Sequence, residues 1–181
     1  MIEEFYFSID DKKFENLVIF DRDDTLIQDV PNLKSVSDIK WIPGRLELLK
    51  TLTEQSVLIA IATNQSAIGR GAMSMEEFGF ISKAIRSQLE NQGIYLWAIV
   101  ACPHLPSEMC ECRKPKPGLL DRLVEATKRN DLNVLFIGNA DSDLEAAQAA
   151  NSKIIGVRLS PELFDNFDLV LNALVKPSGL K

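Results

Sequence analysis

The sequence has little of what secreted miniproteins and membrane proteins need. It contains three cysteines in 181 residues, too few and odd in number for a disulfide framework. No stretch approaches the roughly 18 apolar residues of a membrane span. The acidic N-terminal segment, residues 1–14, lacks the apolar run of a signal peptide. We therefore expect a cytoplasmic protein with no membrane partner.

Basic residues are also in the minority. The chain carries 20 Lys and Arg against 26 Asp and Glu, and its net charge of −6 opposes broad binding to nucleic acid or anionic membranes. We expect no nucleic acid partner, and any anion site must be built locally. The length corresponds to about one compact domain. We expect a single domain over residues 1–181, and a monomer is favoured although the oligomeric state stays open.

Short apolar runs alternate with longer amphipathic stretches, which is the pattern of an α/β protein. Five continuous apolar runs predict parallel strands buried on both faces, at residues 17–20, 57–61, 94–100, 134–137 and 154–157. Helical spacing predicts helices over residues 44–54, 75–91, 117–130 and 142–150. Residues 5–9 would add a strand or a hairpin, and residues 167–175 a last edge strand. The fold class expected is a doubly wound, Rossmann-like parallel sheet.

Polar side chains follow four of the predicted strands. They are Asp21, Asp23 and Thr25 after the first strand, Thr63 and Asn64 after the second, a Cys/His cluster after the third, and residues 138–143 after the fourth. Because ligands of parallel sheets bind beyond the carboxyl ends of the strands, we expect these groups to converge on one cleft. Turns and helix caps would explain any single segment, but they explain the four together poorly.

The cysteines and the single histidine fall within eleven residues of one another. Cys102, His104, Cys110 and Cys112 offer three thiolates and one imidazole, the donor set of tetrahedral Zn²⁺. With all four positions filled by protein, the zinc would be structural and would fix a loop over residues 102–112. Ordinary buried thiols and a redox pair are the alternatives, although Cys110 and Cys112 lack the thioredoxin-type spacing.

Together these motifs resemble the haloacid dehalogenase superfamily of phosphohydrolases. Residues 21–25, Asp-Arg-Asp-Asp-Thr, fit its D-x-D-x-T motif, and Thr63, Lys114 and residues 138–143 are similar to its second, third and fourth motifs. The intervals after the first motif and between the second and third are too short for the inserted cap of many members. The resemblance therefore implies a capless fold.

A narrower resemblance is to the branch of heptose-bisphosphate and histidinol-phosphate phosphatases, carried by residues 63–71 and 102–118. It implies that Asp21 is the nucleophile, which would form an aspartyl-phosphate, and that Asp23 is the general acid and base. The residues expected to bind substrate are Thr63, Asn64, Arg70, Arg113 and Lys114.

The resemblance also implies Mg²⁺, because carboxylates that meet a phosphate would otherwise repel one another. The ligands that the resemblance implies are Asp21, Asp23 through its backbone carbonyl, Asn139 and Asp143. The family places a carboxylate where this chain has Asn139, and this amide predicts weaker Mg²⁺ binding. Asp24 stands where relatives have glycine, and aspartate tolerates the left-handed turn that glycine adopts.

The resulting hypothesis is a Mg²⁺-dependent phosphatase that acts on a small sugar phosphate and carries structural Zn²⁺. A heptose 1,7-bisphosphate is the favoured substrate, and histidinol phosphate is the alternative. An alternative of another class is a zinc-stabilised protein that binds a phosphorylated metabolite, with catalysis weakened by Asn139 and Asp24.

Overall fold

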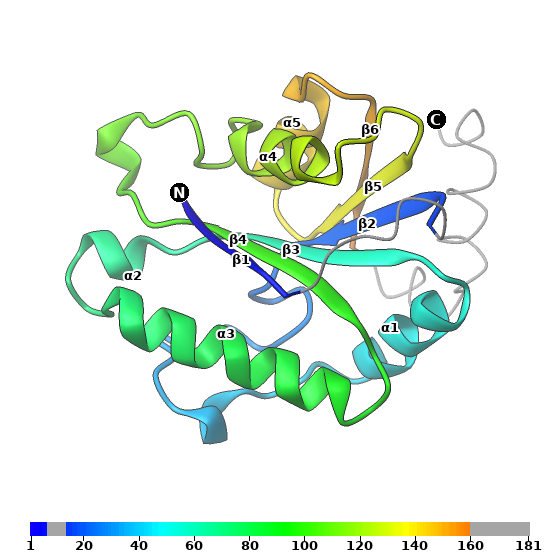
Figure 1. Ribbon diagram of the computed structural model, residues 1–181. Helices are drawn as coiled ribbons and strands as arrows, with labels where there is room; N and C mark the ends of the chain where they lie inside the picture. Colours follow the sequence, from blue (N-terminus) through cyan, green and yellow to red (C-terminus); the bar gives the residue numbers. More distant parts are fainter. Residues whose placement is uncertain (7–13, 160–181) are drawn as a thin grey trace.

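The computed structural model contains one six-stranded sheet with helices on both faces (Figure 1). It describes residues 1–6 and 14–159. The strands are β1 (Ile2–Phe5), β2 (Asn16–Phe20), β3 (Leu58–Asn64), β4 (Leu96–Cys102), β5 (Asn133–Gly138) and β6 (Ile154–Arg158). The helices are α1 (Arg45–Glu54), α2 (Ser66–Gly69), α3 (Met75–Glu90), α4 (Gly118–Thr127) and α5 (Asp141–Ala149), with 3-10 turns at Val36–Asp38 and Pro106–Glu108. Among the described residues, none of the helices is long and apolar enough to cross a membrane.

The strand order is β1-β4-β3-β2-β5-β6. Strands β2 to β6 are parallel, and β1 runs antiparallel beside β4. The chain passes from β2 through β3 to β4 on one side of the sheet, and then crosses to β5 and β6 on the other. The direction of winding therefore reverses at β2. Ligands of such sheets bind at the carboxyl ends of the strands beside this reversal.

Two apolar layers cover the sheet, as the continuous apolar runs predict. Helices α1 and α3 pack on the face that carries Val18 and Phe20, and α4 and α5 pack on the face that carries Leu17 and Ile19 (Figure 1). Successive residues of β2 thus enter opposite layers, and all four of these side chains are fully buried.

The five parallel strands and the doubly wound arrangement are confirmed, although some boundaries differ. Strand β3 continues past residue 61 and β4 past residue 100, because Thr63 and Asn64 pair with Ala101 and Cys102. Helix α4 ends at Thr127, before the expected residue 130, since Lys128 adopts a left-handed φ of 55°.

The expected edge strands have different outcomes. An edge strand does form, but it covers Ile2–Phe5 and shares only Phe5 with the described part of the expected range. Residues 7–9, and the strand expected over residues 167–175, lie outside the described part of the chain.

Candidate active site

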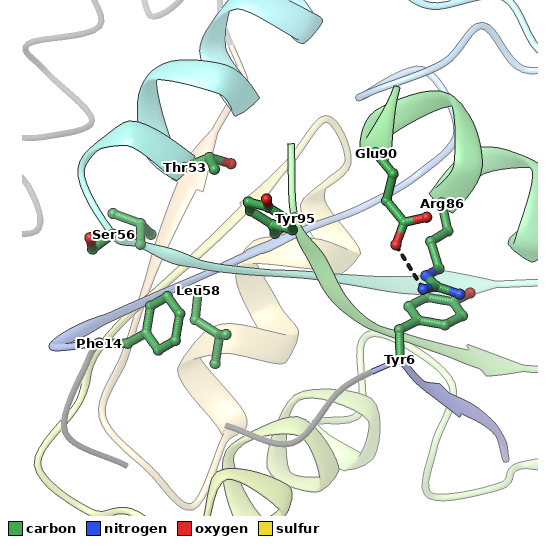
Figure 2. A pocket seen from close by; sticks show the side chains of 9 residues that line it. Tyr6, Phe14, Thr53, Ser56, Leu58, Arg86, Glu90 and Tyr95 are labelled. Carbon is green, nitrogen blue, oxygen red and sulfur yellow. Dashed lines mark ion pairs between the residues drawn. The ribbon is translucent and has the colours of Figure 1, made fainter. Parts of the chain in front are cut away.

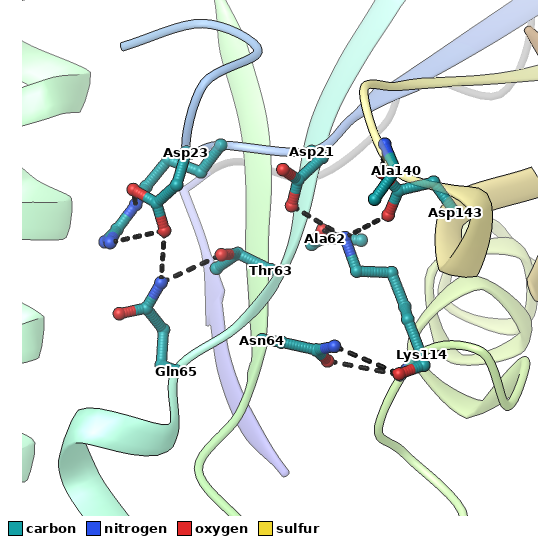
Figure 3. A network of polar contacts seen from close by, with 10 residues as sticks. Asp21, Asp23, Ala62, Thr63, Asn64, Gln65, Lys114, Ala140 and Asp143 are labelled. Atoms are coloured by element: carbon teal, nitrogen blue, oxygen red, sulfur yellow. Dashed lines mark hydrogen bonds and ion pairs between the residues drawn. The ribbon is translucent and has the colours of Figure 1, made fainter. Parts of the chain in front are cut away.

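The polar side chains predicted at the strand ends meet at the carboxyl edge of the sheet (Figure 3). Asp21 follows β2, Thr63 lies near the end of β3, and Asp143 lies in the first turn of α5. Lys114 reaches them from the loop between β4 and α4. The structure therefore brings four motifs together at the point where the winding of the sheet reverses.

The ammonium of Lys114 lies at the centre of this group. It donates to Asp21 Oδ1 at 2.6 Å and to the carbonyl of Ala62 at 2.9 Å, and it lies 2.7 Å from Asp143 Oδ1. The Lys114 side chain is 3% exposed, so both ion pairs are shielded from water. These three acceptors occupy its three N–H donors. A phosphoryl oxygen would have to share or replace one of them.

Asn64 holds the backbone of Lys114. Its Nδ2 donates to the Lys114 carbonyl and its Oδ1 accepts from the Lys114 N–H, each at 3.1 Å. Both polar ends of the amide therefore position the lysine. Direct contact between Asn64 and substrate stays a prediction.

Asp21 lies in a site where negative charge exceeds positive charge. Burial raises the pKa of Asp21 to about 6; Lys114 opposes this shift and Asp143 adds to it. Two carboxylates share one ammonium here, with little water to screen them. Such a site suits a cation that prefers oxygen ligands.

Asp143 is held from two sides. Its Oδ1 faces Lys114, and its Oδ2 accepts the N–H of Ala140 at 3.0 Å at the start of α5. Gly138 makes this approach possible, because a Cβ at that position would overlap the Asp143 carboxylate. The glycine of the fourth motif is thus required by close packing.

Asn139 lies half-buried in the turn between β5 and α5. Its backbone carbonyl accepts from Arg158 Nη1 at 3.0 Å, and Arg158 also pairs with Asp141. Strand β6 therefore holds the turn that presents the amide. Metal binding by Asn139 stays a prediction.

The loop after β2 turns through Asp24. Its φ of 53° confirms the left-handed conformation expected at this position. The exposed carboxylate accepts the N–H of Asp29 at 2.9 Å. The Asp24 side chain therefore stabilises the loop after β2.

Two buried residues that were not predicted for the site contact Asp23. Arg22 forms an ion pair with its carboxylate, and the Gln65 amide donates to both Asp23 and Thr63 (Figure 3). Both lie inside segments that the sequence singles out, Arg22 between the two aspartates and Gln65 directly after Asn64. Their position beside predicted site residues could have indicated that they belong to the site, but it does not indicate that both contact Asp23.

The Cys/His cluster assembles as expected in the loop after β4. The donor atoms of Cys102, His104, Cys110 and Cys112 all lie within 4.8 Å of one another. The three sulfurs lie 3.2, 3.5 and 3.6 Å apart. His104 Nδ1 lies 3.5 Å from the Cys102 sulfur and 3.2 Å from that of Cys112. The cysteines are free thiols, and this compact set could hold one metal ion.

The two predicted substrate-binding arginines occupy different surroundings. Arg113 Nη1 donates to Ser66 Oγ at 2.7 Å and to the His104 carbonyl at 3.4 Å, which joins the Cys/His loop to α2. Arg70 is exposed at the end of α2 and lines a cavity. Contact of either arginine with substrate stays a prediction.

Two cavities of similar size lie at opposite edges of the sheet. One, of about 430 Å³, has Asp23 in its wall. The other, of about 440 Å³, lies where β3 and β4 begin, and its wall includes Tyr6, Phe14 and Tyr95 (Figure 2). Only the first adjoins the polar groups at the strand ends, so it is the candidate substrate cavity.

Known proteins have sequences similar to this chain. Residues 16–153 match the family model described as polynucleotide kinase 3 phosphatase. The D-glycero-beta-D-manno-heptose-1,7-bisphosphate 7-phosphatase of Pseudomonas putida is 35% identical over 143 residues, which cover 78% of this chain and 82% of that protein. The protein of the same name from Pseudomonas aeruginosa is 33% identical over 175 residues, covering 89% and 98%.

A solved structure agrees with the sequence matches. The D,D-heptose 1.7-bisphosphate phosphatase from B. bronchiseptica, complexed with magnesium and phosphate, superimposes with a TM-score of 0.76. Sequence identity is 27%, and the match covers 87% of this chain and 98% of that chain.

Proposed function

Because the chain belongs to the polynucleotide kinase 3 phosphatase family of the haloacid dehalogenase superfamily and is a phosphatase, we propose that it hydrolyses a small sugar phosphate through phosphorylated Asp21. We favour a heptose 1,7-bisphosphate, the compound in the names of relatives that are 33% and 35% identical. The observation that carries the proposal is the buried Lys114 ammonium between Asp21 and Asp143. The adjoining cavity of about 430 Å³ has the size of small-molecule sites.

Asp21 supplies the nucleophile. Lys114 holds one of its oxygens, which leaves the other to attack phosphorus while the bond from phosphorus to the leaving oxygen breaks. The electron pair stays on the leaving oxygen, which takes a proton from the Asp23 carboxyl. Water then attacks the phosphorus of the aspartyl-phosphate and gives a proton to Asp23. The second bond cleavage releases Asp21 and inorganic phosphate.

Thr63 and Lys114 would stabilise the charge on the transferred group. The Thr63 hydroxyl accepts from Gln65 at 2.9 Å, so its own proton is available to a phosphoryl oxygen. Lys114 contributes a compact positive charge already fixed in a buried site, and a preorganised charge needs no rearrangement during the reaction.

We propose Mg²⁺ as the cation of this site. The carboxylates of Asp21 and Asp143, the backbone carbonyl of Asp23 and the Asn139 amide are hard oxygen donors, and they would hold it. The excess of carboxylates over ammonium groups fits a divalent cation. When bound, Mg²⁺ would neutralise phosphate charge. Because Asn139 is neutral, we expect weaker Mg²⁺ binding than a carboxylate at this position would give.

We propose Zn²⁺ for the Cys/His cluster. With Zn–S bonds of about 2.3 Å, the sulfurs of a tetrahedral site lie roughly 3.8 Å apart. The observed separations of 3.2–3.6 Å are close to this value. Four protein ligands leave no open position, so the zinc would be structural. It would fix the loop that leads directly into Arg113 and Lys114.

Phosphate release from a panel of esters tests the proposed function. The panel contains a heptose 1,7-bisphosphate, histidinol phosphate and glycerol phosphate, each with and without added Mg²⁺. Omitting Mg²⁺, rather than adding a chelator, leaves the zinc site loaded. We expect Mg²⁺-dependent hydrolysis with kcat/KM for the heptose ester at least about tenfold above the others. A preference for histidinol phosphate would contradict the substrate, and binding without turnover would support the phosphometabolite-binding alternative.

The zinc proposal predicts a defect in Cys110→Ser. The parent protein, purified without chelator, should carry about one zinc per chain, and the variant much less, with a lower Tm. Elemental analysis and thermal unfolding measure the two effects. Ser107→Ala, on the same loop but outside the cluster, is the matched control and should keep its zinc. Parent protein without zinc would instead support ordinary thiols.

A further inference from the structure

The carboxylate of Asp23 is held by side chains from two different loops. Arg22 Nε donates to Oδ1 at 2.9 Å and Arg22 Nη2 to Oδ2 at 3.0 Å. Gln65 Nε2 also donates to Oδ2, at 2.8 Å, and continues to Thr63 Oγ1 at 2.9 Å (Figure 3). Arg22 is 3% exposed and Gln65 is 5% exposed. Rotation of the carboxylate would break hydrogen bonds to two buried side chains, one from each loop.

Arg22 holds the Asp23 carboxylate at the expense of one of its own hydrogen bonds. By turning Nε and Nη2 toward Asp23, the guanidinium leaves Nη1 buried and without a hydrogen-bond partner among the residues that the structure describes. A buried donor with no acceptor is destabilising and rare, and functional sites are among the places where such donors occur.

The held carboxylate also lines the candidate substrate cavity. Asp23, Arg22 and Gln65 all line the cavity of about 430 Å³, whereas Asp21, Lys114 and Asp143 are not among its lining residues. The phosphoryl group would therefore lie beside the cavity and the leaving alcohol inside it.

We infer that Arg22 and Gln65 are positioning residues that aim the Asp23 carboxyl at the leaving oxygen. This inference rests on the proposed function, in which Asp23 gives its proton to that oxygen. A carboxylate offers about four lone-pair positions. The three observed hydrogen bonds fill both positions on Oδ2 and one on Oδ1. The proton is therefore carried on the remaining position of Oδ1.

The proton moves twice in each turnover. When the bond from phosphorus to the leaving oxygen breaks, the electron pair stays on that oxygen and the Oδ1 proton moves to it, which gives the free alcohol. The Asp23 carboxylate then takes a proton from the attacking water at the same atom. The hydrogen bonds from Arg22 and Gln65 need not break in either step.

The test compares two esters that differ in their need for a general acid. A sugar phosphate leaves as an alkoxide and needs a proton, whereas p-nitrophenyl phosphate leaves as a stable phenolate. We expect Arg22→Met to lower kcat for the sugar phosphate at least about a hundredfold, and kcat for p-nitrophenyl phosphate less than about tenfold. Saturating substrate separates this effect from KM.

The chain offers a matched control in Arg129. This arginine makes the same two-point pair with Asp131, at 2.9 and 2.7 Å, but lies just after α4 and outside the site. Arg129→Met should leave the ratio of the two kcat values at its parental level. Gln65→Met keeps the ion pair of Arg22 and should shift the ratio in the same direction as Arg22→Met, by less.

Each outcome decides the inference. An equal fall in kcat for both esters, or no fall, overturns it and leaves Arg22 a structural residue. If Arg22→Met does not fold, the ratio measured for Gln65→Met decides: a shift supports the inference and a parental ratio overturns it. Parent protein that hydrolyses neither ester shows instead that the proposed function has failed, and the inference with it.

Discussion

Asp21→Asn is expected to abolish phosphate release while leaving the fold intact. An amide is a poor nucleophile and cannot form the acyl phosphate, so turnover should fall at least about a thousandfold. The introduced amide oxygen can still accept from Lys114, which now bonds Asp21 at 2.6 Å. The substitution also removes a negative charge from a site where burial raises the pKa of Asp21 to about 6. Urea unfolding should therefore show stability equal to that of the parent or higher.

Asp24→Asn is the matched control for this prediction. It makes the same chemical change three residues away, at an exposed position whose left-handed backbone asparagine also tolerates. Its turnover should stay within about threefold of the parent. Near-parental turnover by folded Asp21→Asn would rule out the covalent mechanism. Acid-quenched parent protein should in addition carry phosphate that hydroxylamine releases.

The parallel sheet could be predicted because its strands are buried on both faces. Continuous apolar runs such as the one in β2 reflect two packing layers, and they mark where each strand passes through the core. Hydropathy does not mark the end of a strand where its last residues are polar. Thr63 and Asn64 extend β3 through backbone pairing with β4, and their polar side chains end the apolar run too early.

The gathering of the candidate site residues could be predicted, but their individual contacts could not. Ligand chemistry and strand-end position identify Asp21, Lys114 and the Cys/His cluster, because few other arrangements explain these residue types together. Which side chains form hydrogen bonds with one another depends on how residues from different strands are placed in the folded sheet. The bonds from Asn64 to the Lys114 backbone and from Gln65 to Asp23 join residues 50 and 42 positions apart. No local pattern encodes these pairings.

Lys114→Met is expected to damage both stability and activity. The ammonium lies between Asp21 and Asp143, and removing it leaves two carboxylates facing each other in a buried site. Breaking a buried ion pair on one side costs roughly 3–5 kcal/mol of unfolding free energy. Loss of one preorganised charge at the reacting group should lower kcat by about a hundredfold to a thousandfold. Urea unfolding and phosphate release measure the two effects.

The double variant Lys114→Met/Asp143→Asn separates the two roles of the lysine. The amide oxygen that replaces the Asp143 carboxylate can still accept the N–H of Ala140, while the repulsion with Asp21 disappears. If Lys114 stabilises the protein by neutralising charge, the double variant should recover much of the lost stability but none of the lost activity. Lys116→Met, on the same loop with a side chain 41% exposed, controls for loss of a lysine and should cost less than about 1 kcal/mol. A Lys114→Met protein as stable as Lys116→Met would show that another group compensates the charge of the buried carboxylates. Unfolding at increasing Mg²⁺ concentration would then test whether the cation is that group.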